Sequence, residues 1–224
     1  MTTATVSRRT PGRRAMLGAR RSATAVVVGV LGTLVGLAGV EHGIGEMLQR
    51  PVRPDGLFIQ SWPDARSLEI LSGEPAMTVI PNLLVTGVLA VLVGLAVAAW
   101  SIWFAGRRHG GPGLVALSVA LLLVGGGLVP PLMGAVLGAV ATRIGGTPRH
   151  GPRALGRAIA PAWPWFLAAA LVGYLGLMPG MVLASAAGLV SEALVMALGA
   201  VAFTGFGFAL AAARAHDCLD TAVT

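Results

Sequence analysis

The chain has 224 residues, of which 55% are hydrophobic and only 11% are charged, and its mean hydropathy is +0.81. Soluble domains carry about 25% charged residues, so this composition excludes an ordinary water-soluble domain and indicates a protein that lies in a lipid bilayer. Its net charge of +7 comes from 16 arginines and no lysine. Because these arginines flank apolar runs, as orientation signals do, we expect the bilayer as the partner and no nucleic acid. The single cysteine, Cys218, excludes an internal disulfide and a Cys-rich metal site.

Five uncharged runs organise the chain. Crossing about 30 Å of hydrocarbon takes roughly 20 helical residues, and the runs cover 23–40, 76–106, 110–142, 158–191 and 193–213. The first run follows a basic tail, residues 1–22, and no A-x-A site comes after it, so we predict a retained helix rather than a cleaved signal peptide. The runs together predict an all-α polytopic transmembrane helix bundle, a single domain over residues 23–214.

Charged residues predict how this bundle is oriented. Arginines without nearby acids fill 1–21, 107–108 and 143–157, whereas six acids outnumber three arginines in 41–75. Arginine-rich short loops stay in the cytoplasm. We therefore expect a cytoplasmic tail and basic loop at 1–22 and 143–157, an extracytoplasmic acidic loop at 41–75 and a cytoplasmic tail at 215–224. These assignments place both termini on the cytoplasmic side of a bacterial inner membrane.

The run 110–142 has to return to the side on which it starts, because arginines flank both of its ends. As one helix its 33 residues would extend about 50 Å, too long for a single crossing. Its middle reads GGGLVPP at 125–131, where Pro130 and Pro131 are poor helix interior. We predict a helical hairpin that turns there, giving four full crossings plus the hairpin, or six crossings if the hairpin spans.

Small residues form a stripe along the first apolar run. Spacings of 3, 4, 3 and 4 separate Gly29, Gly32, Gly36, Gly39 and Gly43. Such stripes let helix backbones approach closely in lipid, so this face is predicted to pack against another helix.

The stripe leads into EHGIGE at 41–46, where His42 precedes Glu46 by four residues and shares its side of a continued helix. Three interpretations stay open. The first is a polar helix end whose acids and histidine are either solvated or paired with Arg50 and Arg53. The second is a metal site at His42 and Glu46, completed by other acids, although no cofactor is required by the sequence. The third is a proton- or ion-handling group near a pathway.

The segment 73–87, GEPAMTVIPNLLVTG, contains a second set of candidates. Pro75 suits the first turn of a helix. Pro81 would then lie about two turns into that helix, followed directly by Asn82. This break is either a structural kink with an interhelical hydrogen bond or the lining of a substrate site. A further helix break is expected at Pro179. The candidates for an ion or solute pathway are thus Glu41, His42, Glu46, Glu74 and Asn82.

Four strings support a resemblance: EHGIGE at 41–46, SWP at 61–63, the segment 73–87 and GGGLVPP at 125–131. With them the chain resembles a group of small bacterial integral membrane proteins that carry no assigned activity, over about residues 25–145. The resemblance implies a polytopic prokaryotic membrane protein and supplies no catalytic or binding residue.

Catalytic signatures are lacking, since the sequence contains no GxxxxGK[ST], HExxH or GxSxG. Three functions remain, in order of preference. The first is a small permease or channel-like protein, or a subunit of one, for an ion or small solute. The second is a non-catalytic assembly protein that docks a partner or a second copy through the glycine stripe. The third is a metal-dependent membrane enzyme that uses the 41–46 cluster.

Overall fold

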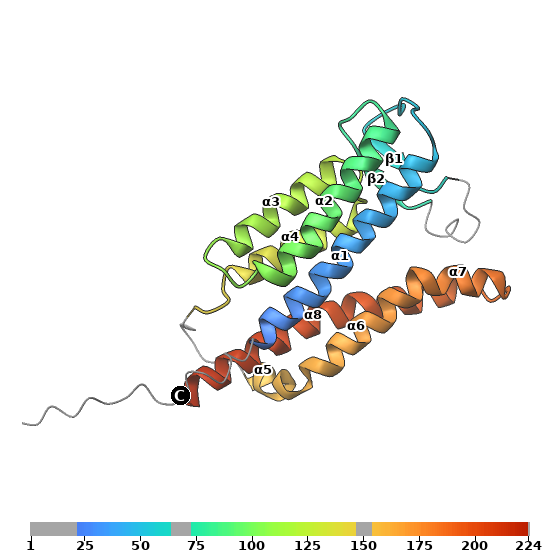
Figure 1. Cartoon of the computed structure of the whole chain (residues 1–224). Coiled ribbons are helices and arrows are strands. Elements are labelled where there is room, and N and C mark those ends of the chain that lie inside the picture. Colours follow the sequence, from blue (N-terminus) through green and yellow to red (C-terminus); the bar gives the residue numbers. More distant parts are fainter. Residues whose placement is uncertain (1–21, 64–72, 147–153, 224) are drawn as a thin grey trace, which may run out of the picture.

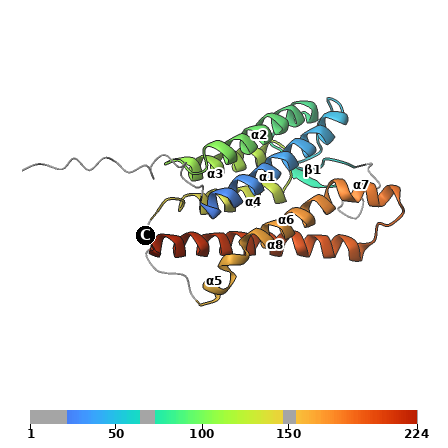
Figure 2. The same cartoon turned by 60° about the horizontal axis from the view of Figure 1, so that its bottom comes forward.

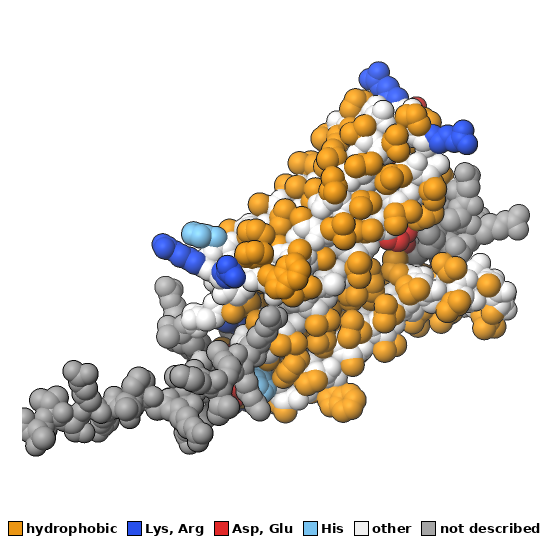
Figure 3. Space-filling view, viewed as in Figure 1, with side chains coloured by type: hydrophobic (Ala, Val, Ile, Leu, Met, Phe, Trp, Pro, Cys, Tyr) orange, Lys and Arg blue, Asp and Glu red, His pale blue; other side chains and the backbone are white. Residues whose placement is uncertain are grey.

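Four helical stretches are long and apolar enough to cross a membrane, judged by length and composition. In this computed structural model, which describes residues 22–63, 73–146 and 154–223, they are Ala23–Leu48, Leu83–Trp103, Ala154–Leu177 and Glu192–Thr221. Hydrophobic side chains cover the outer faces of the helices, and most of the charged ones lie near the ends (Figure 3). The prediction of an all-α, multi-pass membrane protein is confirmed.

The helices form two units (Figure 1). The first unit contains α1 (Ala23–Leu48), α2 (Leu83–Trp103), α3 (Gly110–Leu123) and α4 (Val129–Ala141). The second contains the short helices α5 (Ala154–Ile159) and η3 (Ala160–Ala162), then α6 (Trp163–Leu177), α7 (Pro179–Ala186) and α8 (Glu192–Val223). Two short antiparallel strands, β1 (Phe58–Gln60) and β2 (Pro75–Met77), lie between α1 and α2 in the chain.

The glycine stripe of α1 packs against α2. A Cβ built on Gly36 would lie 2.5 Å from the carbonyl oxygen of Gly94, and one on Gly43 would lie 2.6 Å from that of Gly87. Only glycine allows backbones to come this close. The predicted packing face therefore exists, and its partner is the next helix of the same chain.

The predicted hairpin at 110–142 is present as α3 and α4, with the turn at residues 124–128. Pro130 and Pro131 lie in the first turn of α4, where a missing N–H costs no helical hydrogen bond. They begin a helix here instead of interrupting one. Pro179 does the same for α7 after α6 has ended at Leu177, so the predicted break in the fourth run is confirmed.

The C-terminal part of α8 fastens the second unit to the first. The Asp217 carboxylate accepts hydrogen bonds from the backbone N–H groups of Ala23, at 2.8 Å, and Thr24, at 3.0 Å, and so caps α1. Arg214 donates to the carbonyl oxygen of Arg143, beyond the end of α4, at 2.7 Å. We call this end of the molecule the terminal end, and the end that holds β1, β2 and the turn 124–128 the sheet end.

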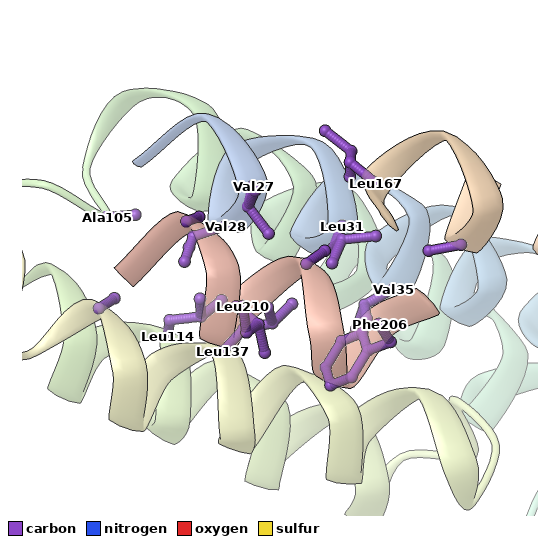
Figure 4. Packing of buried hydrophobic residues seen from close by; sticks show 14 of the residues in the cluster. Val27, Val28, Leu31, Val35, Ala105, Leu114, Leu137, Leu167, Phe206 and Leu210 are labelled. Carbon is purple, nitrogen blue, oxygen red and sulfur yellow. The ribbon is translucent and has the colours of Figure 1, made fainter. Parts of the chain in front are cut away.

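Buried apolar side chains fill the space between the units near the terminal end. Leu210 and Phe206 of α8 pack among residues of α1, α3 and α4 in one cluster, which includes Val28, Leu31, Leu114 and Leu137 (Figure 4). Toward the sheet end, α1 and α8 diverge in both views (Figures 1 and 2). The molecule is therefore a wedge that is closed at the terminal end.

Residues 41–48 are the last turns of α1, so the helix continues through EHGIGE. The next helix begins at Leu83 rather than near Pro75, so the predicted helix start at Pro75 was wrong. Pro75 instead opens β2, and Pro81 precedes the helix without breaking it. The reason is tertiary: β2 pairs with β1, and Thr78 bridges to Val124 in the hairpin turn, so this segment is held in an extended form.

Candidate functional site

The last turns of α1 bring three of the predicted residues to the sheet end. His42 and Glu46 share one side of the helix and are 5% and 0% exposed, whereas Glu41 is partly exposed. Glu74 joins them from the residues just before β2 and is 5% exposed. Its backbone has a φ of 54°, next to Gly73 at 67°, which is a conformation that few non-glycine residues adopt. This turn directs the Glu74 side chain into the bundle. We call Glu41, His42, Glu46 and Glu74 the acidic cluster.

His42 lies at the centre of the acidic cluster. Its Nδ1 is 2.9 Å from the carbonyl oxygen of Ala38 and 3.1 Å from Glu41 Oε2, and its Nε2 is 3.6 Å from Glu74 Oε2. The shorter contact assigns the Nδ1 proton to Ala38, because the carbonyl oxygen can only accept. Nε2 therefore faces Glu74 across a distance that is too long for a hydrogen bond.

Glu46 is the most deeply buried acid of the cluster. Its Oε1 accepts one long hydrogen bond, 3.4 Å, from the hydroxyl of Ser61. Ser61 follows β1, and its backbone N–H donates to the carbonyl oxygen of Glu74 at 3.1 Å. The loop that carries Ser61 thereby links Glu46 to Glu74.

The hairpin turn covers the cluster with two glycines. Gly125 and Gly127 have φ values of 91° and 85°. A Cβ on Gly125 would overlap the carboxylate of Glu46, and one on Gly127 would lie 2.7 Å from His42 Nε2. The N–H of Gly125 donates to the carbonyl oxygen of Met77 at 2.9 Å, which holds the turn over the site. Sequence reasoning gave GGGLVPP only a turning role and missed this contact.

The acidic cluster contains more hydrogen-bond acceptors than donors. Among the residues that the structure describes, no donor bonds to four of its buried carboxylate oxygens: Glu41 Oε2, Glu46 Oε2 and both oxygens of Glu74. Burial, and to a smaller extent the nearby charge of Glu41, raise the pKa of Glu74 to about 8, although the nearby charge of His42 opposes this rise. Glu74 is therefore mostly protonated at neutral pH unless a cation replaces the proton.

A metal ion is one such cation. Glu41, His42 and Glu74 each offer one ligand atom, and these atoms lie within 4.8 Å of one another. Carboxylate and imidazole ligands suit several divalent transition metals. This group joins His42 to Glu41 and Glu74, two of the acids that could complete the predicted metal site, and it does not include Glu46.

A cavity of about 320 Å³ adjoins the cluster between the two units. Helices α1, α4, α6 and α8 supply an apolar wall, and His42 and Glu74 lie at its polar end. The Tyr174 hydroxyl of α6 crosses to α1 and donates to the carbonyl oxygen of Leu34 at 3.1 Å. Acidic surface is visible where the two units separate (Figure 3).

Two features expected from the sequence are not part of this site: Asn82 as a pathway residue, and the pairing of the acids with arginine. Asn82 caps α2, since its Oδ1 accepts from the N–H groups of Leu84, at 3.0 Å, and Val85, at 3.3 Å, so it takes no part in the cluster. Within the described residues, neither Arg50 nor Arg53 forms an ion pair with the clustered acids. The burial of His42 and Glu46 does not fit a polar helix end whose acids and histidine are solvated.

Comparison with known proteins adds no assignment to this site. No family model, no curated protein and no solved structure matches this chain.

Proposed function

We propose that the protein is a small permease, or the membrane subunit of one, and that the acidic cluster binds the transported cation. One observation carries this proposal: the described residues supply no hydrogen bond to four buried carboxylate oxygens of the acidic cluster, whose nearest cationic group is His42, 3.1 Å from Glu41 Oε2 and 3.6 Å from Glu74 Oε2. Burying an unpaired carboxylate costs several kcal/mol, so protons or another cation must compensate. Ionisable groups at membrane depth are by default candidates for ion or proton pathways.

The wedge shape supports transport rather than binding alone. Hydrogen bonds that Asp217 accepts and Arg214 donates join the units at the terminal end, and the cavity lies between them toward the sheet end. Leu114, Leu137 and Leu210 close the terminal side with apolar packing. Permeases work by alternating between such one-sided states, through rocking of one bundle against another. Movement of α6–α8 about their attachment to α1 is the corresponding motion here.

The sheet end is proposed to face outward, with both termini in the cytoplasm of a bacterial inner membrane. The positions of Arg107, Arg108 and Arg143 near the terminal end support this orientation. Helices α3 and α4 have 14 and 13 residues, so each is about 20 Å long and too short to cross the hydrocarbon alone. Four full crossings with a hairpin that does not span the bilayer fit these lengths.

The other functions considered from the sequence fit less well. Docking of a partner required the glycine stripe, but Gly32, Gly36, Gly39 and Gly43 are buried within the chain. The metal-dependent enzyme has one observation in its favour, the grouping of Glu41, His42 and Glu74. A metal ion therefore belongs among the cations to be tested.

Transport currents from proteoliposomes on a solid-supported membrane test the proposal. Jumps in Mn²⁺, Na⁺ and ethylammonium cover a divalent, an alkali and an organic cation. At least one is expected to give a current in the wild type that falls at least tenfold in the double variant Glu46→Gln/Glu74→Gln. Glu192→Gln is the matched control, because Glu192 is an exposed acid at the start of α8. If a cation binds to the purified protein and none gives a current, the permease proposal is wrong.

A further inference from the structure

The cavity beside the acidic cluster has two chemically different parts. Its wall is apolar, from Leu31 and Val35 of α1 and Met133 of α4 to Phe203 and Phe206 of α8. Only at the sheet end do charged groups enter it, namely His42 and Glu74. A bare metal ion or a proton would use the polar end and leave the apolar wall without a function.

The size of the cavity fits a small organic ligand. Small-molecule pockets have volumes of about 300–1,000 Å³ and are mostly apolar, with a few polar groups that fix orientation. At about 320 Å³, with two charged side chains at one end, this cavity lies within that description. The ligand that matches it has an apolar body and one polar end.

The acidic cluster determines the chemistry of that polar end. Both oxygens of Glu74 are buried and have no donor among the described residues, and Glu74 Oε2 lies 3.6 Å from His42 Nε2. Glu41 and Glu46 add further carboxylates and no donors. An anionic ligand would be repelled by the carboxylates, and a neutral one would leave Glu74 with its proton rather than replace it. A primary ammonium carries one positive charge and three N–H donors.

We propose that the cavity binds an alkylammonium ligand, with its apolar chain between α1, α4 and α8 and its ammonium group on Glu74. This inference rests on the proposed function in that it uses the same acidic cluster, and it adds the class of ligand. A free amine and the head group of an aminophospholipid share this chemistry. The cavity lies between helices of the two units, α1 and α4 on one side and α6 and α8 on the other.

Binding of three eight-carbon probes to the protein in phosphatidylcholine nanodiscs tests the inference. The probes are n-octylammonium, n-octanol and n-octanoate, with empty nanodiscs subtracted to remove partitioning into lipid. Octylammonium is expected to bind at least tenfold more tightly than octanol, and octanoate is expected not to bind. Glu74→Gln should abolish the preference for ammonium and leave octanol binding within twofold.

A second pair of variants tests the wall. Met133→Trp should weaken octylammonium binding at least tenfold by filling the cavity, whereas Leu132→Trp, at the neighbouring lipid-facing position that is 59% exposed, should leave it unchanged. Addition of phosphatidylethanolamine to the nanodiscs separates the two sources, because only an aminophospholipid site would then show competition.

Two results would overturn the inference: equal binding of octanoate and octylammonium, or octylammonium binding that survives both Glu74→Gln and Met133→Trp. Its failure is distinguishable from that of the permease. A Mn²⁺ or Na⁺ current without octylammonium binding removes only the ligand class, and octylammonium binding without any current removes only transport.

Discussion

At the scale of single residues, the site depends on two glycines, which have no side chain. Gly125 and Gly127 allow the hairpin backbone to lie directly on Glu46 and His42, and both have positive φ. Glu46 is fully buried beneath this contact, and a buried carboxylate is costly unless a proton or another cation compensates its charge. These two glycines therefore belong to the site as much as the acids do.

Substitution of Gly125 separates backbone strain from crowding of the site. Gly125→Ala is expected to destabilise the protein by about 2–5 kcal/mol, because an alanine at positive φ costs about 1–2 kcal/mol and overlap with Glu46 adds about 1–3 kcal/mol. Gly145→Ala is the matched control, since Gly145 also has a positive φ, 74°, but a Cβ there would meet nothing within 4 Å. Thermal or denaturant unfolding in detergent gives both values. Equal losses in the two variants would show that Glu46 is not crowded.

The sequence predicts part of this site and not the rest, for a physical reason. His42 and Glu46 were paired correctly because helical periodicity is a local property. The approach of Glu74 to them and the lid of Gly125 and Gly127 depend on contacts between segments far apart in the chain. Nothing in local spacing reports that a loop and a hairpin turn meet over one helix end.

At the scale of elements, close backbone contact organises the first unit. Gly36 and Gly43 of α1 meet Gly94 and Gly87 of α2. The stripe was visible in the sequence, but its partner was not, because a small-residue face fits a neighbour in the same chain as well as one in another. The start of α2 was missed for a similar reason. Pairing of β2 with β1 overrides the helix-start pattern at Pro75.

Substitution of Gly36 measures what the α1–α2 contact contributes. Gly36→Ala should destabilise the protein by about 1–3 kcal/mol and Gly36→Leu by more, because the obstacle is backbone that cannot rotate away. Gly207→Leu, in α8, should be neutral or slightly stabilising, since a Cβ there meets nothing within 4 Å and leucine favours helix. Unfolding of the three variants in detergent measures the effect. If the Gly36→Leu variant were as stable as the wild type, α1 and α2 would have to lie further apart than the 2.5 Å distance from a Cβ built on Gly36 to Gly94 implies.

The Gly36 series also bears on the docking alternative. Because the stripe is buried against α2, Gly36→Ala should leave the oligomeric state of the folded protein unchanged in size-exclusion chromatography with light scattering. Loss of a complex without loss of stability would restore the stripe as a surface for a partner.

At the scale of the whole molecule, the two units are joined by few polar contacts. The Asp217 carboxylate receives the first two N–H groups of α1, although the residues are separated by more than 190 positions in the chain. Together with the apolar cluster around Leu210, this cap fixes the closed end of the wedge. At the sheet end the cavity lies between the units. The angle between the two units therefore depends on the contacts of α8 with α1 at the closed end.

Removal of the Asp217 cap should therefore loosen the whole wedge. Asp217→Ala is expected to reduce stability by about 1–2 kcal/mol, as for loss of a helix N-cap, and to speed hydrogen exchange at the start of α1. Asp220→Ala is the control, because Asp220 lies one turn further along α8, its side chain is 71% exposed, and it pairs with His216 at 3.5 Å.

The same variant tests whether the cap acts as a hinge for the proposed transport motion. In a Cys218→Ser background, spin labels at Leu57 and Leu189 report the distance across the sheet end, because both residues are exposed and lie in different units. Double electron–electron resonance measures this distance distribution. Asp217→Ala should broaden or shift it, and Asp220→Ala should not. A cap that matters only locally would lower stability and leave the distribution unchanged. In that case the apolar cluster around Leu210, rather than Asp217, sets the angle between the units.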